Sequence, residues 1–171
     1  MKTKLLMVCI LAMIIIGTPL QVFASDGVNE GASVEENQMI IQEMSLEEAE
    51  RWYNELIKED MIEPRSDLGT CELGISSSDG KLVVIYSTSC RGIASRIGVK
   101  NITLQQKKGL LWDEIVVRSA YEENTDAYFG GFYLTNPGVG NTFRVHGVHY
   151  AVKDGSELSI YNETDTYKFN G

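Results

Sequence analysis

The sequence has few of the residues from which metal and redox sites are commonly built. Its 171 residues include 3 Cys and 2 His, too few for a His-rich metal centre or a zinc ribbon. The motifs HExxH, GxSxG and the phosphate-binding loop do not occur in it. Basic residues are outnumbered, with 15 Lys and Arg against 24 Asp and Glu, and nucleic-acid phosphates need clustered positive charge. We therefore expect no cofactor, no metal, no nucleic-acid partner and no enzymatic activity.

Long apolar runs are missing except at the N-terminus. There, Lys2 and Lys4 precede an uncharged stretch of 13 residues, Leu5–Gly17, which is shorter than the roughly 20 residues that a membrane-spanning helix needs. Val22-Phe23-Ala24 has the small-x-small pattern of a signal-peptidase site. The sequence predicts a signal peptide at residues 1–24 and a mature chain that is secreted, extracellular or cell-surface associated, with no membrane span after cleavage.

Acidic charge is concentrated directly after this segment. Residues 25–67 contain 13 acidic and 3 basic residues, whereas residues 68–171 contain 11 and 10. The beginning of the acidic part is polar and shows no periodicity, so we interpret residues 25–44 as a flexible acidic leader. Since residues 68–171 are nearly neutral, the global acidic balance says little about what they bind.

An amphipathic helix is predicted at residues 45–63. Ser45 and Glu48 have the spacing of a capping box. Apolar residues recur on one helical face, namely Leu46, Ala49, Trp52, Tyr53 and Leu56. The helix should end before Pro64, because the residue ahead of a proline avoids the α region. The sequence leaves open whether the apolar face docks on the same domain, binds a partner, or belongs to a pro-segment removed near Pro64-Arg65.

From residue 68 onward the apolar pattern alternates with a period of two, as in β-strands. Turn residues separate the runs, at Ser77–Gly80, Lys107–Gly109, Asn136–Gly138 and Lys153–Gly155. Gly130-Gly131 interrupts an aromatic run, where we expect a bulge or a bend. The pattern predicts a mainly β fold, an antiparallel β-sandwich of about six to eight strands over residues 68–171 with one N-terminal amphipathic helix.

Several short motifs lie in this β region. They are Ile97-Gly98-Val99, Leu104-Gln105, Leu111-Trp112 and Phe143-Arg144-Val145-His146-Gly147-Val148-His149. Through them, residues 68–171 resemble a family of secreted β-sandwich domains of unknown function from Gram-positive bacteria, with an IGV…LQ…W core and a Y-R-V-x-G-x-H strand. The chain departs from that pattern by carrying Phe143 where Tyr is usual. The resemblance implies a secreted bacterial β-sandwich and leaves the function open.

Cys71 and Cys90 are the two cysteines of the predicted mature chain, and an oxidising exterior favours a disulfide between them. The expected register opposes this pairing. If Ser77–Gly80 forms the turn, Cys71 lies opposite Tyr86 and not opposite Cys90. A disulfide and two free thiols are both open on the sequence alone.

The two histidines, His146 and His149, are three residues apart. On a strand this spacing directs them to opposite faces. We therefore expect one structural, hydrogen-bonded His and one exposed His, and no shared metal.

Aromatic residues supply the candidate interaction surface. Tyr128 and Tyr133 belong to the run around Gly130-Gly131, which serves either core packing or a stacking platform for a wall polymer. Trp52 and Leu56 lie on the apolar face of the predicted helix, which needs a surface to pack against. We take these four residues as the candidate surface.

Together these features favour a secreted, non-enzymatic extracellular protein, an interaction module for a cell-envelope component or a protein partner. One alternative is a secreted toxin- or bacteriocin-like effector with an acidic pro-segment. A second alternative is a small extracellular hydrolase, although the sequence alone selects no pair of catalytic carboxylates.

Overall fold

The structure, a computed structural model, describes residues 38–56 and 67–171. The predicted signal peptide, most of the predicted leader, residues 57–63 of the predicted helix and the Pro64-Arg65 site lie outside the described residues.

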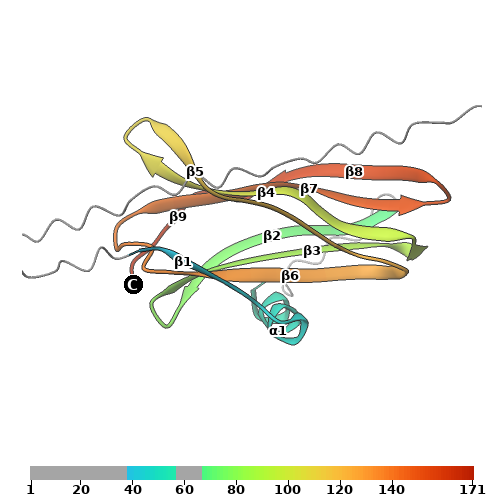
Figure 1. Ribbon diagram of the computed structural model, residues 1–171, viewed down its shortest axis with the longest axis horizontal. Helices are drawn as coiled ribbons and strands as arrows, with labels where there is room; N and C mark the ends of the chain where they lie inside the picture. The colour runs from blue at the N-terminus through green and yellow to red at the C-terminus, as the bar shows by residue number, and fades with distance from the viewer. Residues whose placement is uncertain (1–37, 57–66) are drawn as a thin grey trace, which may run out of the picture. The chain divides into compact units, whose positions relative to one another are not determined.

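The described chain is mainly β, with antiparallel sheets and one short helix (Figure 1). The elements are β1 (Ile40–Glu43), α1 (Leu46–Leu56), β2 (Leu68–Ser78), β3 (Lys81–Ala94), β4 (Arg96–Lys108), β5 (Leu111–Glu122), β6 (Thr125–Thr135), β7 (Thr142–Lys153), β8 (Ser156–Glu163) and β9 (Tyr167–Lys168). One sheet has the strand order β1-β6-β3-β2, the other has the order β5-β4-β7-β8, and β9 pairs with β7. The two sheets face one another as layers, as in a β-sandwich (Figure 1).

The main core lies between the two sheets and is built by the alternation of apolar residues along each strand. Its buried members are Leu82, Val84, Tyr86, Val99, Ile102, Leu104, Val116, Phe132, Leu134, Phe143, Val145 and Phe169. A smaller cluster consists of Leu68, Ala94, Ile97 and Ala151. Because burying one such large apolar side chain contributes about 1.5–3 kcal/mol, these clusters make a large favourable contribution to the free energy of folding.

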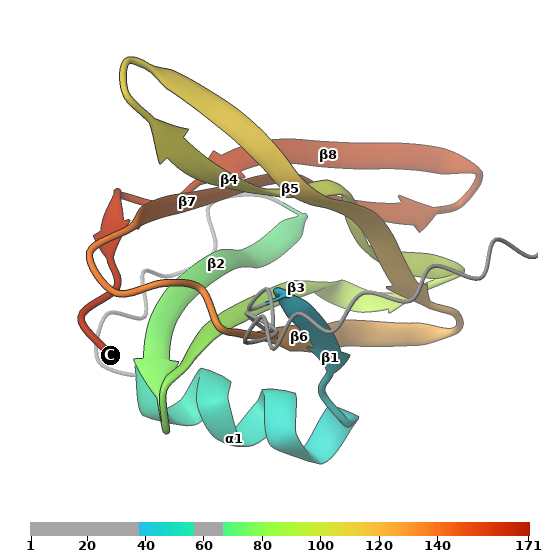
Figure 2. The ribbon, with the colours of Figure 1, turned by 60° about the vertical axis from the view of Figure 1, so that its left-hand side comes forward.

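Strand β3 is buried on both of its faces. Leu82 and Val84 point into the core, whereas Val83 and Ile85 alternate with them and are equally buried. Helix α1 lies across this outer face of the sheet and packs on β3 and β6 (Figure 2). Its Ala49 is almost completely buried. The middle of the apolar helix face therefore packs on the same domain, whereas Leu46 and Leu56 near its two ends are exposed.

Gly130 and Gly131 do not form the expected bulge. The pairing of β6 with β3 runs through both residues without a register shift. Of the bulge or bend expected there, the bulge is therefore ruled out. A Cβ at Gly130 would lie 2.4 Å from the Tyr86 ring, and a Cβ at Gly131 would lie 2.7 Å from Met44 Sδ. The two glycines make room for side chains on opposite faces of the sheet.

Strand β1 shows that the predicted flexible leader extends too far and that the predicted start of the β domain at residue 68 is too late. Ile40–Glu43, within the leader expected at residues 25–44, pairs antiparallel with β6. The sheet therefore contains a strand from before residue 68. The described residues form nine strands, of which eight (β2 to β9) lie within residues 68–171. The strand has only four residues and lies at the sheet edge with all of them exposed, so it has no alternating pattern of buried and exposed residues.

The β2–β3 hairpin has a shorter turn than expected. Ser78 pairs with Lys81, which leaves Asp79 and Gly80, both with positive φ, as a two-residue turn of the type I′ class. The expected Ser77–Gly80 turn was two residues longer. As a result Cys71 pairs with Thr88 and not with Tyr86.

The two histidines lie on different faces of β7, as expected. His149 is completely buried and His146 is half-buried. His149 Nδ1 lies 2.8 Å from Thr88 Oγ1. Because Thr88 donates its single hydroxyl hydrogen to the Gly98 carbonyl oxygen, Nδ1 must donate to Thr88 Oγ1 in the neutral ring.

Burial lowers the pKa of His149 from 6.5 to about 4. Between these two values the unfolded chain binds a proton that the folded chain does not bind, so stability falls as the pH falls through this window and is unaffected above it. We expect this group alone to remove about 3 kcal/mol of unfolding free energy between pH 7 and pH 4. Urea unfolding at a series of pH values measures the loss.

The variant His149→Gln should show a flatter pH dependence than the parent over this window, and His146→Gln serves as the matched control. Identical pH slopes for the parent and His149→Gln would contradict the assignment, whatever the absolute stability of the variant.

Candidate functional site

The start of helix α1 is fixed by the predicted capping box. Ser45 Oγ accepts a hydrogen bond from the Glu48 N–H at 3.2 Å, and Glu48 Oε2 accepts one from the Ser45 N–H at 2.9 Å. These bonds satisfy donors that the first helical turn leaves unpaired, and they hold the pKa of the Glu48 carboxyl below its usual value. The cap sets where the helix begins and thereby where Trp52 lies.

Two aromatic pairs join α1 to β6. The Trp52 indole Nε1–H donates to the Tyr133 hydroxyl oxygen at 2.9 Å. Tyr53 meets Phe129 edge-on, with ring centroids 5.1 Å apart, a favourable geometry for aromatic rings. The helix is thus held by directional contacts as well as by apolar burial.

A pocket of about 240 Å³ lies beside the first of these pairs, and we call it the Trp52–Tyr133 pocket. Its remaining lining residues are polar or charged: Gln42, Glu48, Arg51, Ser78, Asp79 and Lys81. They come from β1, α1 and the β2–β3 hairpin. The pocket therefore exists only because the helix docks where these elements meet.

The charged groups of this pocket have both signs. Lys81 Nζ lies 5.4 Å from the centroid of the Tyr133 ring, within cation–π range. The side chains of Gln42 and Arg51 make no hydrogen bond or ion pair with any residue of the described ranges. An aromatic wall with unengaged hydrogen-bonding groups around it is suited to a polar, largely uncharged ligand.

The structure joins two of the four predicted interaction residues. Trp52 and Tyr133 are in direct contact. Tyr128 points to the opposite face of β6, where its ring stacks on Tyr86 at a centroid distance of 6.1 Å. Leu56 is exposed at the end of α1 and lines a different hollow. The four residues therefore do not form one surface.

The hollow beside Leu56 also contains the carboxyl groups of Glu72, Glu163 and Asp165. Burial raises the pKa of Glu72. Both oxygens of Glu163 are engaged, one by the Tyr161 hydroxyl at 2.6 Å and the other by Arg144 Nη1 at 2.7 Å, and the Tyr161 bond lowers the pKa of Glu163. Because both of its carboxylate oxygens already accept hydrogen bonds, Glu163 is poorly placed to attack a substrate or to activate a water.

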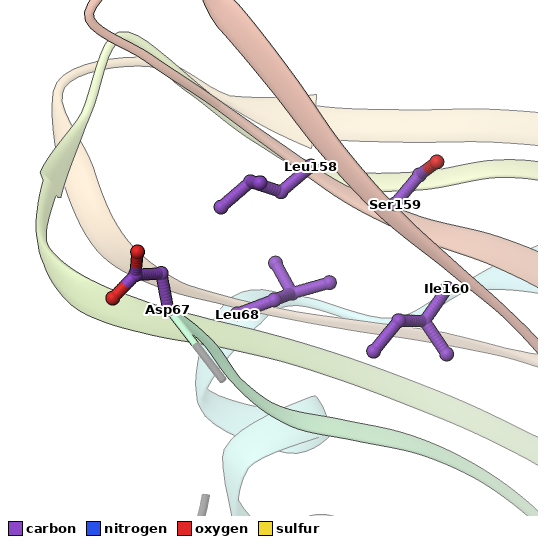
Figure 3. A pocket seen from close by; sticks show the side chains of 5 residues that line it. All are labelled: Asp67, Leu68, Leu158, Ser159 and Ile160. Atoms are coloured by element: carbon purple, nitrogen blue, oxygen red, sulfur yellow. The ribbon is translucent and has the colours of Figure 1, made fainter. Parts of the chain in front are cut away.

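A third hollow, of about 320 Å³, lies between the edge strands β2 and β8. Figure 3 shows the side chains that line it, in which Leu68, Leu158 and Ile160 supply apolar walls beside Asp67 and Ser159. It contains one carboxyl group, so it does not offer the paired carboxylates of a glycosidase. It is an apolar gap at the open side of the two sheets.

Cys71 and Cys90 are free thiols in the structure. Cys90 pairs with Leu68 and Cys71 pairs with Thr88, with a register shift between them, so the two cysteines are not directly opposite. The Cys90 thiol lies 3.1 Å from the carbonyl oxygen of Gly92 on its own strand. Burial raises the pKa of the Cys71 thiol to about 12 and also raises that of Cys90, which disfavours a reactive thiolate at either position.

The motif residues on which the family resemblance rests contact one another between neighbouring strands and stabilise the sheet. Arg144 Nε donates to Gln105 Oε1 at 2.7 Å, and the Arg144 guanidinium lies 4.4 Å from the Trp112 ring centroid. Gly98 admits no side chain, since a Cβ there would lie 2.1 Å from the Ala120 carbonyl oxygen. These residues connect β4, β5 and β7 and do not line the Trp52–Tyr133 pocket.

Within residues 38–56 and 67–171, no three His, Cys, Asp or Glu side chains are grouped so as to hold a metal ion. The same part of the chain contains no helix with the length and apolar character needed to cross a membrane. Comparison of the chain with protein-family models, curated proteins and solved structures gives no match.

The alkylation rates of the two thiols test the environments of Cys71 and Cys90 directly. In the folded chain at pH 8 we expect iodoacetamide to modify both more slowly than in urea, with Cys71 at least about 100-fold slower because so little of it is thiolate. Mass spectrometry of peptides over a time course measures both rates. An intact mass lower by two hydrogens, with no alkylation of either residue, would show the disulfide instead.

Proposed function

We propose that the chain is a secreted, non-enzymatic bacterial β-sandwich module that binds a saccharide of the cell envelope in the Trp52–Tyr133 pocket. The single observation that carries this proposal is the composition of that pocket, in which an indole and a phenol lie among amide, guanidinium, ammonium and carboxylate groups.

The chemistry of sugars matches this lining. A sugar ring presents apolar C–H faces and a rim of hydroxyl groups. Aromatic rings offer the flat apolar contact, and the Gln42, Arg51 and Asp79 side chains offer both donors and acceptors to hydroxyls. A small number of placed polar groups around an apolar wall is the usual composition of a ligand pocket.

The mixed charge of the pocket argues for a neutral or zwitterionic ligand. Arg51 and Lys81 are cationic, whereas Glu48 and Asp79 are anionic, so the pocket offers no excess of positive charge for a polyanion. The uncharged sugar units of a wall polymer therefore fit better than its phosphate or carboxylate groups.

Binding is favoured over hydrolysis at this pocket. Glu48 and Asp79 are its two carboxyl groups, but the hydrogen bonds from Ser45 lower the pKa of Glu48. A general acid for glycoside cleavage needs a raised pKa instead. Glu48 is thus suited to its structural role as a helix cap.

The docking of α1 also favours an interaction module over an effector with a removable pro-segment. Loss of the helix would expose the apolar Val83 and Ile85 on the outer face of β3 and leave Tyr133 without its Trp52 partner. Exposing such apolar surface to water is unfavourable.

The proposal is tested by co-sedimentation of the secreted chain with purified peptidoglycan sacculi. We expect Trp52→Ala and Arg51→Ala each to weaken binding about tenfold or more, because each removes a contact from the pocket. The matched control is Arg91→Ala, an exposed cation of β3 outside the pocket.

Thermal unfolding of each variant separates lost binding from lost folding, and Arg51→Ala should melt like the parent since Arg51 is exposed. Full binding by both Trp52→Ala and Arg51→Ala would refute the pocket as the binding site.

A further inference from the structure

The three most exposed large apolar side chains of the described residues share one end of the sandwich. Leu110 is 97% exposed, Val139 is 75% exposed and Leu111 is 72% exposed. Leu110 and Leu111 lie at the β4–β5 turn, and Val139 lies in the loop between β6 and β7. The pairing of Gln106 with Phe143 places the end of β4 beside the start of β7, so both turns belong to the same end.

The β4–β5 hairpin projects from this end, away from the sheet that contains β3 (Figures 1 and 2). Lys108 pairs with Leu111, so the loop between the strands is only Gly109-Leu110. Gly109 adopts a φ of 63°, which glycine accommodates without strain. The tight turn leaves Leu110 at the outermost point of a convex projection, where no other described segment covers it.

Charged residues follow the apolar turn along both strands of the hairpin. Lys107 and Lys108 are exposed next to Leu110 and Leu111, and the acidic Asp113 and Glu114 follow one level further back. The tip, which we define as Lys107–Trp112, is thus locally cationic in a chain with a net charge of −9. Leu110 at the turn lies ahead of the Lys108–Leu111 pair, and Lys107 lies one pair further back. Leading apolar side chains with lysines beside and behind them match an anionic lipid surface, in which the hydrocarbon lies below the phosphates, because a lysine can extend its ammonium group back to the headgroups.

Trp112 forms the base of the tip. It pairs with Lys107 across the hairpin, is half-buried, and lies against the Arg144 guanidinium at 4.4 Å. Arg144 is itself held by Gln105 and Glu163. Tryptophan is enriched at the level of lipid headgroups, and this one is fixed at the depth that Lys107 would occupy.

We propose that the Lys107–Trp112 tip inserts into the surface of an anionic lipid bilayer, with Leu110 and Leu111 entering the acyl boundary and Lys107 and Lys108 contacting headgroup phosphates. A protein partner fits this feature less well, because a stable protein interface needs about 800 Å² from each partner and a two-residue convex turn presents little area. The inference is independent of saccharide binding, since none of the tip residues lines the Trp52–Tyr133 pocket.

The test is co-sedimentation of the secreted chain with unilamellar vesicles of phosphatidylglycerol and phosphatidylcholine, compared with vesicles of phosphatidylcholine alone. We expect binding to the anionic vesicles that weakens with added salt. The double variant Leu110→Asp/Leu111→Asp should bind at least tenfold more weakly. The double variant Lys107→Gln/Lys108→Gln should lose about fivefold per lysine on the anionic vesicles.

Two matched controls lie at the opposite end of the sandwich, on the last residues of β3. Ile93→Asp removes a side chain that is 62% exposed, and Arg91→Gln removes one exposed cation; both should bind like the parent. Trp52→Ala should also bind vesicles like the parent, which separates failure of this proposal from failure of the saccharide proposal.

All the tip substitutions are at exposed positions, and thermal unfolding confirms that each variant is folded. The proposal is overturned if the parent does not bind anionic vesicles at low salt, or if the Leu110→Asp/Leu111→Asp variant binds them as the parent does. Loss of binding to whole cells by that variant, without any vesicle binding by the parent, would also overturn it and indicate a protein partner.

Discussion

The structure depends on one constraint, the need to cover both faces of β3. Its residues from Leu82 to Thr88 are all buried, so one face packs in the inter-sheet core and the other requires a second cover. Helix α1 supplies that cover through Ala49 and through the Trp52–Tyr133 and Tyr53–Phe129 contacts. Strand β1 extends the same sheet, and Met44, which follows it, occupies the space left by Gly131. Residues 38–56, which belong to the acidic segment before residue 68, are therefore an integral part of the domain.

The proposed binding pocket is a consequence of this cover. The helix carries Glu48, Arg51 and Trp52 to the edge of the sheet, where the β2–β3 hairpin adds Asp79 and Lys81. Without the docked helix, the three helix residues would not meet the two hairpin residues. The β4–β5 tip belongs to the facing sheet and has the opposite character, apolar at its outermost point and cationic behind it. The β2–β3 and β4–β5 turns fall at the same end of the molecule (Figure 1). Strand β3 runs away from the first turn, and β4 follows after one residue and runs back.

Much of the fold follows from periodicity, but long-range contacts do not. Alternation predicted strands β2 to β8, and the Ser45–Glu48 spacing predicted where α1 begins. Strand β1 was not predicted, because it is a short, exposed edge strand that is held by pairing with β6. Gly130 and Gly131 suggested a bulge or a bend, because the sequence shows only that two side chains are missing. It does not show that the side chains of Tyr86 and Met44 fill the space beside these glycines. Trp52 and Tyr133 were both candidates, but only the docked helix shows that they meet across 81 positions.

The central claim is that the helix docks on the sheet and forms a saccharide pocket there. The most direct measurement follows the two indole N–H resonances of the ¹⁵N-labelled chain, Trp52 and Trp112, during titration with soluble muramidase fragments of peptidoglycan. We expect the Trp52 resonance to shift and saturate while the Trp112 resonance stays in place, since Trp52 lines the pocket and Trp112 does not. Saturable binding of the fragments with an unchanged Trp52 resonance would contradict it.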